Sequence, residues 1–162
     1  MNTEELTATL RAHLLLTHNK KGGARADLSA ADLSGNDFSG LKLTSMRAPS
    51  ATFDRCTLVQ TDLEQGDFFD ASFAYADCRG TNFRNADLRG TNFHGAKLAG
   101  ANFTGCNLSG ADLGECDLYG AQLINTNLRD TNFQGSDLRG VALRGSDLSG
   151  ANLAGADLRD GS

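Results

Sequence analysis

Residues 86–110 read ADLRG TNFHG AKLAG ANFTG CNLSG, which is five units of five residues each. Every unit begins with a small residue, has Leu or Phe in third place and ends with glycine. The same phase extends in both directions, from Ala26 to Asp160, without insertion or deletion, and gives 27 units. The third or central residue is Leu in 17 units and Phe in eight, and the exceptions are Ala48 and Cys78. A strict period predicts a repeat architecture.

A period of five residues fits neither regular secondary structure. Steps of five rotate by about 140° on an α-helix, which would spread the central residues around its axis. On a continuous strand, an odd period places successive central residues on opposite faces. A short extended segment ended by a turn satisfies the pattern, because the first and central residues of each unit then share one face. None of these 54 residues is charged, so they form the predicted core.

The other positions of the unit carry turn signals. The second residue is Asp or Asn in 19 of the 27 units, and such side chains bond nearby backbone groups in turns. The fifth residue is glycine in 14 units, which suits a turn position with positive φ. Each unit is therefore expected to be one short side followed by a corner.

The tandem A-(D/N)-(L/F)-x-x over residues 26–160 resembles the pentapeptide repeat family. The resemblance implies an all-β fold, a right-handed quadrilateral parallel β-helix with four units per coil. On that arrangement the 27 units make about 6.75 coils, with backbones roughly 4.8 Å apart. Two parts of the chain are expected: an N-terminal segment 1–25 and a repeat domain 26–160.

Residues 1–25 lack the repeat and predict one helix. Asn2 and Glu5 have the spacing of a capping box. The sequence from Asn19 to Gly23 is a stop signal. An apolar stripe follows a helical spacing of four at Leu6, Leu10 and Leu14. We expect this helix to cover the first coil, because an open solenoid end exposes apolar side chains and unpaired backbone. A helix that binds a membrane or a partner is the alternative.

The C-terminal end keeps the repeat phase, and no helix signal follows it. Three explanations are open. The last coil stacks on a second copy in a homodimer, or it is polar enough to stand uncovered, or the chain is a fragment of a longer one.

Charge and composition exclude several classes of protein. The net charge is −5 and no apolar run exceeds four residues, so we expect neither direct nucleic-acid binding nor a membrane span. There is no secretory signal pattern at the N-terminus. The four cysteines have no C-x-x-C spacing and are expected as free thiols in a cytoplasmic protein. They fall at core positions: Cys56, Cys78, Cys106 and Cys116.

One face of the four-sided arrangement gathers carboxylates: Asp32, Asp54, Asp112 and Glu115. We call these four residues the acidic face. Some pentapeptide repeat proteins resemble a DNA duplex in shape and charge and bind type II topoisomerases, which gives quinolone resistance. The resemblance therefore implies DNA mimicry as an alternative function. The other interpretation of these carboxylates is a solvated surface of turn-forming residues.

Three outward apolar residues are a candidate partner-binding patch: Val59, Phe69 and Tyr75. The alternative is local packing, in which Phe69 stacks over Pro49. Tyr119 is expected to stack against Arg139, one coil further along.

No catalytic, cofactor or metal site is expected. The predicted core of the repeat contains no carboxylate or imidazole, and no nucleotide-binding loop or metal-ligand spacing is present. The sequence thus favours a non-catalytic protein-interaction scaffold with a protein partner of unknown identity.

Overall fold

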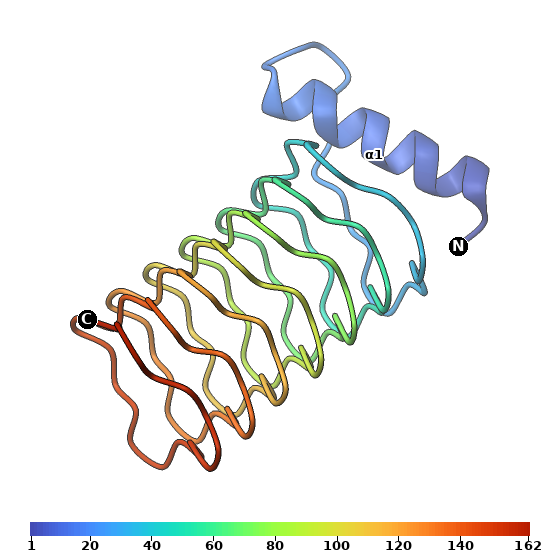
Figure 1. Ribbon diagram of the computed structural model, residues 1–162. Coiled ribbons are helices and arrows are strands. Elements are labelled where there is room, and N and C mark those ends of the chain that lie inside the picture. The colour runs from blue at the N-terminus through green and yellow to red at the C-terminus, as the bar shows by residue number, and fades with distance from the viewer.

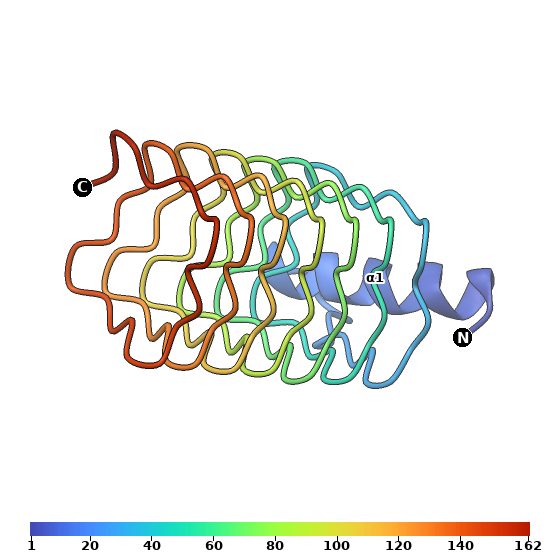
Figure 2. The ribbon, with the colours of Figure 1, turned by 60° about the horizontal axis from the view of Figure 1, so that its bottom comes forward.

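Backbone hydrogen bonds connect residues 19 and 21 positions apart along the repeat. The N–H of Leu28 donates to the carbonyl of Arg47 at 2.7 Å, and the N–H of Arg47 donates to the carbonyl of Ala26 at 3.0 Å. Parallel bridges join second-position residues 20 positions apart, from Asp27–Arg47 to Asp137–Asp157. Since 20 residues are four units, each coil has four sides. The computed structural model describes all 162 residues and confirms the right-handed quadrilateral parallel β-helix (Figures 1 and 2).

The strands are very short, because a corner follows each side. Each unit contributes one bridge residue to the sheet on its side and no longer strand forms. At the corner, the N–H of the next unit's first residue bonds the central carbonyl, as from Ala31 to Leu28 at 3.0 Å. All 27 fifth-position residues have positive φ, 14 of them glycine and 13 other types. The corner therefore imposes a left-handed backbone whichever residue stands there.

The core is a narrow column of central and first-position side chains. Phenylalanine rings of successive coils stack face to face: Phe53 on Phe73 and Phe73 on Phe93, both at 4.8 Å between ring centres. Buried hydroxyls at first positions donate back to the coil before, as from Thr81 Oγ1 to the Leu58 carbonyl at 2.6 Å. Coil-to-coil stacking of this kind stabilises solenoids.

The predicted helix is present as α1 (Thr3–Thr17) and lies across the first coil (Figure 1). The capping box forms, because the Asn2 side chain accepts from the Glu5 N–H at 2.9 Å and Glu5 accepts from the Asn2 N–H at 3.0 Å. The leucine stripe packs against the core of the solenoid through Leu6, Leu10 and Leu14. No helix of the structure has both the length and the apolar character that a bilayer span requires.

The last coil is less well covered than those before it. Its central residues Leu148 and Leu153 are half-buried, and Leu158 is 43% exposed.

Candidate interaction surface

The exposed aromatic residues lie at corners of the solenoid. Phe69 and Tyr75 belong to successive units and occupy neighbouring corners of one coil, with 41% and 57% of their surface exposed. Val59 is ten residues before Phe69, which is half a coil, and it is partly buried at the opposite corner. The three residues therefore do not form one contiguous patch. What remains is a pair of aromatic rings along one side of a coil.

The ring of Tyr75 is held from two sides. Tyr75 is a fifth-position residue with φ of 58°, which directs its side chain along the rod. The guanidinium of Arg55, one coil before, lies 5.8 Å from the ring centre. The imidazole of His94, in the next coil, meets the ring edge to face at 5.9 Å. The ring is therefore exposed yet restrained, which lowers the entropy that binding would cost.

Phe69 has a similar arrangement. The guanidinium of Arg89, one coil further on, lies 5.2 Å from the ring centre. Arg89 is itself fixed by Asp87, with Nε to Oδ1 at 2.8 Å and Nη2 to Oδ2 at 2.6 Å. The expected ring–guanidinium contact between Tyr119 and Arg139 is confirmed at 5.7 Å. Aromatic rings stacked by an arginine from a neighbouring coil are thus a recurring construction on this surface.

The acidic face is discontinuous. Asp32 and Asp54 lie in the first two coils, whereas Asp112 and Glu115 lie in the fifth. Three coil spacings, roughly 14 Å, separate Asp54 from Asp112. The side chains between them on this face carry no carboxylate: Ser72, Ala74, Asn92 and His94. The four carboxylates therefore form two separate groups.

Three of these carboxylates accept hydrogen bonds within the solenoid. The side chain and N–H of Ser34 donate to Asp32 at 2.7 and 3.0 Å, and these bonds hold the pKa of Asp32 below its usual value. Asp54 accepts from the Ser72 hydroxyl and from the Ala74 N–H. Asp112 accepts from the Asn132 amide at 2.8 Å. The bonds to Asp32 stabilise a turn, whereas those to Asp54 and the Asn132 bond to Asp112 connect neighbouring coils.

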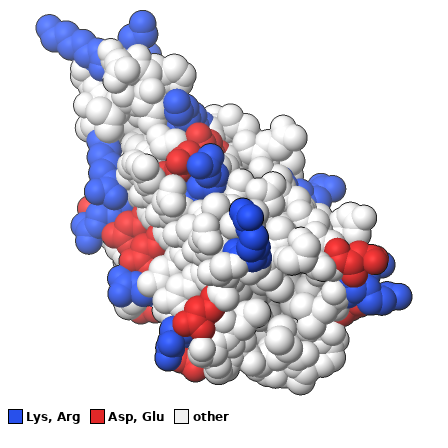
Figure 3. Space-filling view, turned by 90° about the vertical axis from the view of Figure 1, so that its left-hand side faces the viewer, with Lys and Arg blue, Asp and Glu red and all other residues white.

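Many other carboxylates are neutralised by an arginine two residues later. Bidentate pairs with the same geometry occur at Asp77–Arg79, Asp87–Arg89, Asp137–Arg139 and Asp157–Arg159. In the last pair, hydrogen bonds from Arg159 lower the pKa of Asp157 to about 2. Figure 3, which views the molecule toward the end of the rod where the C-terminus lies, shows acidic and basic side chains interspersed there.

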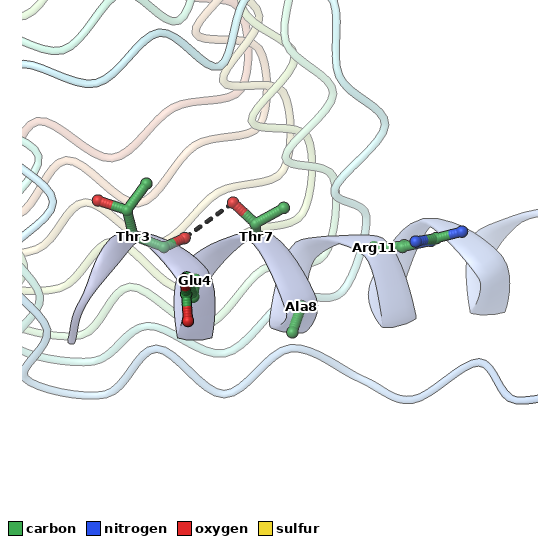
Figure 4. A pocket seen from close by; sticks show the side chains of 5 residues that line it. All are labelled: Thr3, Glu4, Thr7, Ala8 and Arg11. Carbon is green, nitrogen blue, oxygen red and sulfur yellow. Dashed lines mark hydrogen bonds between the residues drawn. The ribbon is translucent and has the colours of Figure 1, made fainter.

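Other parts of the molecule offer less to a ligand. Figure 4 shows a hollow lined only by residues of α1, in which the Thr7 hydroxyl donates to the Thr3 carbonyl at 2.8 Å. It has no lining residue from the solenoid. No three His, Cys, Asp or Glu side chains are grouped so that they could hold a metal ion.

The four thiols are buried and free, as the sequence predicts. Burial raises the pKa of Cys56 to about 11 and of Cys106 and Cys116 to about 12. Three of them act as donors, for example Cys106 to the Phe83 carbonyl at 2.7 Å. They replace the threonine hydroxyls of other coils, and nothing in their surroundings activates them as nucleophiles.

Sequence reasoning missed one residue, His13. It is fully buried between α1 and the first coil, and its Nδ1 accepts from the Ala26 N–H at 3.0 Å. The available signal was its position within the leucine stripe, three residues after Leu10 and one before Leu14.

Comparison with known proteins identifies the repeat. A family model described as "Pentapeptide repeat region" matches residues 46–123 and 81–153, together about two thirds of the chain. No curated protein matches the sequence. A trypsin-treated variant of QnrB1, described as a plasmid-mediated fluoroquinolone resistance protein, is 22% identical over 86% of this chain and 73% of its own, with a TM-score of 0.45.

Two other solved structures are pentapeptide repeat proteins. Rfr23 from the cyanobacterium Cyanothece 51142 is 22% identical over 80% of this chain and 89% of its own, with a TM-score of 0.47. A thylakoid lumen protein from Arabidopsis thaliana is 30% identical over 64% of this chain and 69% of its own, with a TM-score of 0.33. The five-residue unit, the four-sided coil and the family match over residues 46–153 together show that this chain belongs to the pentapeptide repeat family.

Proposed function

We propose that this protein is a non-catalytic scaffold that binds another protein through the side of the solenoid bearing Phe69 and Tyr75. The observation that carries the proposal is that both rings are exposed at neighbouring corners of one coil and both are restrained by an arginine. Aromatic and arginine side chains are enriched among the residues that dominate protein–protein binding energy. Restrained rings lose little freedom on binding, which favours affinity.

The charges around the two rings suit a protein partner with both signs of charge. Arg55 and Arg89 contribute positive charge, and Asp54 and Asp70 contribute negative charge nearby in sequence and coil. The solenoid interior contains only apolar and small polar side chains, so it offers no shielded acid–base pair. We place the protein in the cytoplasm, and the support for this is that all four thiols are free.

The test is affinity capture of the partner from cells of the source. The wild-type chain is compared with the double variant Phe69→Ala/Tyr75→Ala. Tyr119→Ala is the matched control, because Tyr119 is also 57% exposed and also lies under an arginine, Arg139. Loss of these rings is expected to weaken capture of the partner tenfold or more. Equal capture by the double variant and the wild type, or an equal loss in Tyr119→Ala, would overturn the proposal.

Binding to a type II topoisomerase as a DNA mimic is the second candidate, and its support is weaker. A mimic needs a dense run of unpaired carboxylates, whereas Asp87 and Asp137 are each paired with an arginine two residues later. The unbroken repeat phase also leaves no projecting loop in the solenoid. A supercoiling assay with gyrase, with and without a quinolone, tests this function. Protection of gyrase at micromolar protein would favour the mimic over the scaffold.

A further inference from the structure

His13 connects α1 to the solenoid through a single buried hydrogen bond. It is the only fully buried residue of α1, and the stripe residues on either side of it pack against the first coil. Its Nδ1 accepts from the backbone N–H of Ala26, the residue at which the repeat begins. The imidazole therefore lies at the centre of the contact between the helix and the first coil.

The geometry fixes the protonation state of this ring. A backbone N–H can only donate, so Nδ1 of His13 must be unprotonated to accept from Ala26. The neutral ring then carries its proton on Nε2, which is buried and has no hydrogen-bond partner. A second proton on Nδ1 would face the Ala26 N–H directly. The docked helix is thus compatible with the neutral imidazole and incompatible with the imidazolium.

We propose that α1 is an acid-released cap, in which uptake of a proton by His13 breaks the bond to Ala26 and frees the helix from the first coil. The release leaves the rest of the solenoid intact, because the bonds between coils involve no residue of α1. One example is the bond from the Leu28 N–H to the Arg47 carbonyl. Release uncovers the apolar end of the first coil, including the central residues Leu28 and Leu33.

The surroundings of His13 favour the neutral ring. From the first coil, the backbone carbonyls of Leu43 and Thr44 face it. From the linker, Arg25 is the charged group whose field acts on it, held nearby by a hydrogen bond to the Ser45 carbonyl. Burial, and to a smaller extent Arg25, keep the pKa of His13 below 6.5, against the opposing effect of the two carbonyls.

The other charged groups of the two elements stand outside this contact. Arg11 on α1 is exposed, and so are the charged residues of the first coil, Lys42, Asp27, Asp32 and Asp37, none of which contributes to the pKa of His13. The helix carboxylates Glu4 and Glu5 lie in its first turn, more than two turns before His13. No carboxylate is therefore placed to stabilise an imidazolium in the docked state.

The direction of the pH effect follows from the lowered pKa. The released helix exposes His13 to water, with a pKa near 6.5, so release takes up a proton as pH falls below that value. Docking is therefore independent of pH above about 6.5 and weakens by at most tenfold per pH unit below it. The surface carboxylates with lowered pKa values stay ionised above pH 5. Their protonation therefore does not overlap with the protonation of His13.

The experiment measures the hydrogen-exchange protection factor of the Ala26 amide between pH 7.5 and 5.0 in the whole chain. Amides of inner coils, such as that of Leu108, report the integrity of the solenoid. His13→Asn is the matched variant, because its Oδ1 can accept from Ala26 but does not titrate. His18→Asn is the control, because His18 is exposed at the end of the same helix and its side chain reaches the Leu14 carbonyl.

The expected result is a loss of Ala26 protection of up to tenfold per pH unit in the wild type and in His18→Asn. The Leu108 amide stays protected throughout, and Ala26 in His13→Asn stays protected at both ends of the range. Unchanged protection of Ala26 in the wild type, or a pH effect that persists in His13→Asn, overturns the proposal.

If α1 of the His13→Asn variant does not dock at any pH, the wild-type protein alone tests the proposal. Ala26 protection in the wild type must then be constant above about pH 6.5 and fall below it, and any NMR titration of the ring must be accompanied by that fall. Protection without this change of slope, or a ring that titrates without loss of protection, overturns the proposal.

Discussion

The ring of Tyr75 lies over Gly95, one coil further along the rod, so closely that a Cβ at Gly95 would be 2.6 Å from Cε1 of the ring. The same relationship holds at other corners, where a non-glycine fifth residue covers a glycine 20 positions on. Asp70 covers Gly90 in this way, and Asn125 covers Gly145. These glycines are required for two reasons, a positive φ and the side chain above them.

Gly95→Ala and Gly100→Ala separate these two reasons. Both glycines have φ near 66°, but a Cβ at Gly100 would meet nothing within 4 Å. We expect Gly100→Ala to cost about 1 kcal/mol from the left-handed backbone alone. Gly95→Ala should cost more, and Tyr75→Ala in the same chain should remove the excess. Urea unfolding of Gly95→Ala, Tyr75→Ala and the double variant against the wild type gives the coupling energy, and a coupling of zero would show that the ring moves away without cost.

Thr81→Val tests the buried bonds between coils. The Thr81 hydroxyl donates to the Leu58 carbonyl at 2.6 Å, and that carbonyl also accepts from the Thr61 N–H at 3.0 Å. Because one bond to the carbonyl remains, we expect a loss of about 1 kcal/mol in the free energy of unfolding. Thr81→Ser, which keeps the hydroxyl, is the control. A larger loss in Thr81→Ser than in Thr81→Val would assign the effect to the methyl group.

Acid should destabilise the solenoid below about pH 4. Hydrogen bonds from Arg79 and Arg139 lower the pKa values of Asp77 and Asp137, and Arg159 lowers that of Asp157 to about 2. A carboxyl whose pKa is lower in the folded state stabilises the fold above its unfolded value, near 3.9, and loses this contribution as pH falls toward 2. Thermal unfolding followed by circular dichroism from pH 5 to pH 2 measures this loss. An unfolding temperature that stays constant over this range would contradict the interpretation.

The thiols should be inert in the folded protein. Burial raises the pKa of Cys106 and Cys116 to about 12, so neither forms a thiolate at neutral pH. We expect a thiol reagent at pH 8 to label all four cysteines only at the rate of unfolding, and rapidly in denaturant. Mass spectrometry counts the labels. Fast labelling of a thiol without denaturant would show that its coil opens locally.

The fold could be predicted from local rules. The roles of the first and central residues are set within each unit, so charge exclusion from 54 positions revealed the core without knowledge of any contact. The same holds for α1, where the bonds between Asn2 and Glu5 follow from their spacing. The four-sided coil came from the family resemblance, because a five-residue period alone does not say how many sides close a turn.

The surface could not be predicted to the same depth. Val59, Phe69 and Tyr75 are all outward positions, but whether they meet depends on which of four corners each occupies. The contact between His13 and Ala26 depends on how the helix crosses the first coil, which no local signal determines. Contacts between different corners, and between α1 and the first coil, therefore could not be predicted from the sequence.

Because each coil takes 20 residues, the sequence number of a residue determines which coil and which corner it occupies. Removing 20 residues would shorten the rod by one layer, roughly 4.8 Å, and leave every remaining corner in line. Removing five would instead turn everything beyond the cut by about a quarter revolution, since four sides make a turn. If the deletion lay between Phe69 and Tyr119, their side chains would point in different directions relative to each other. The contacts around each ring would stay the same. Evolution can thus adjust the distance and the bearing between two surface features of this rod independently, by the length of a single deletion.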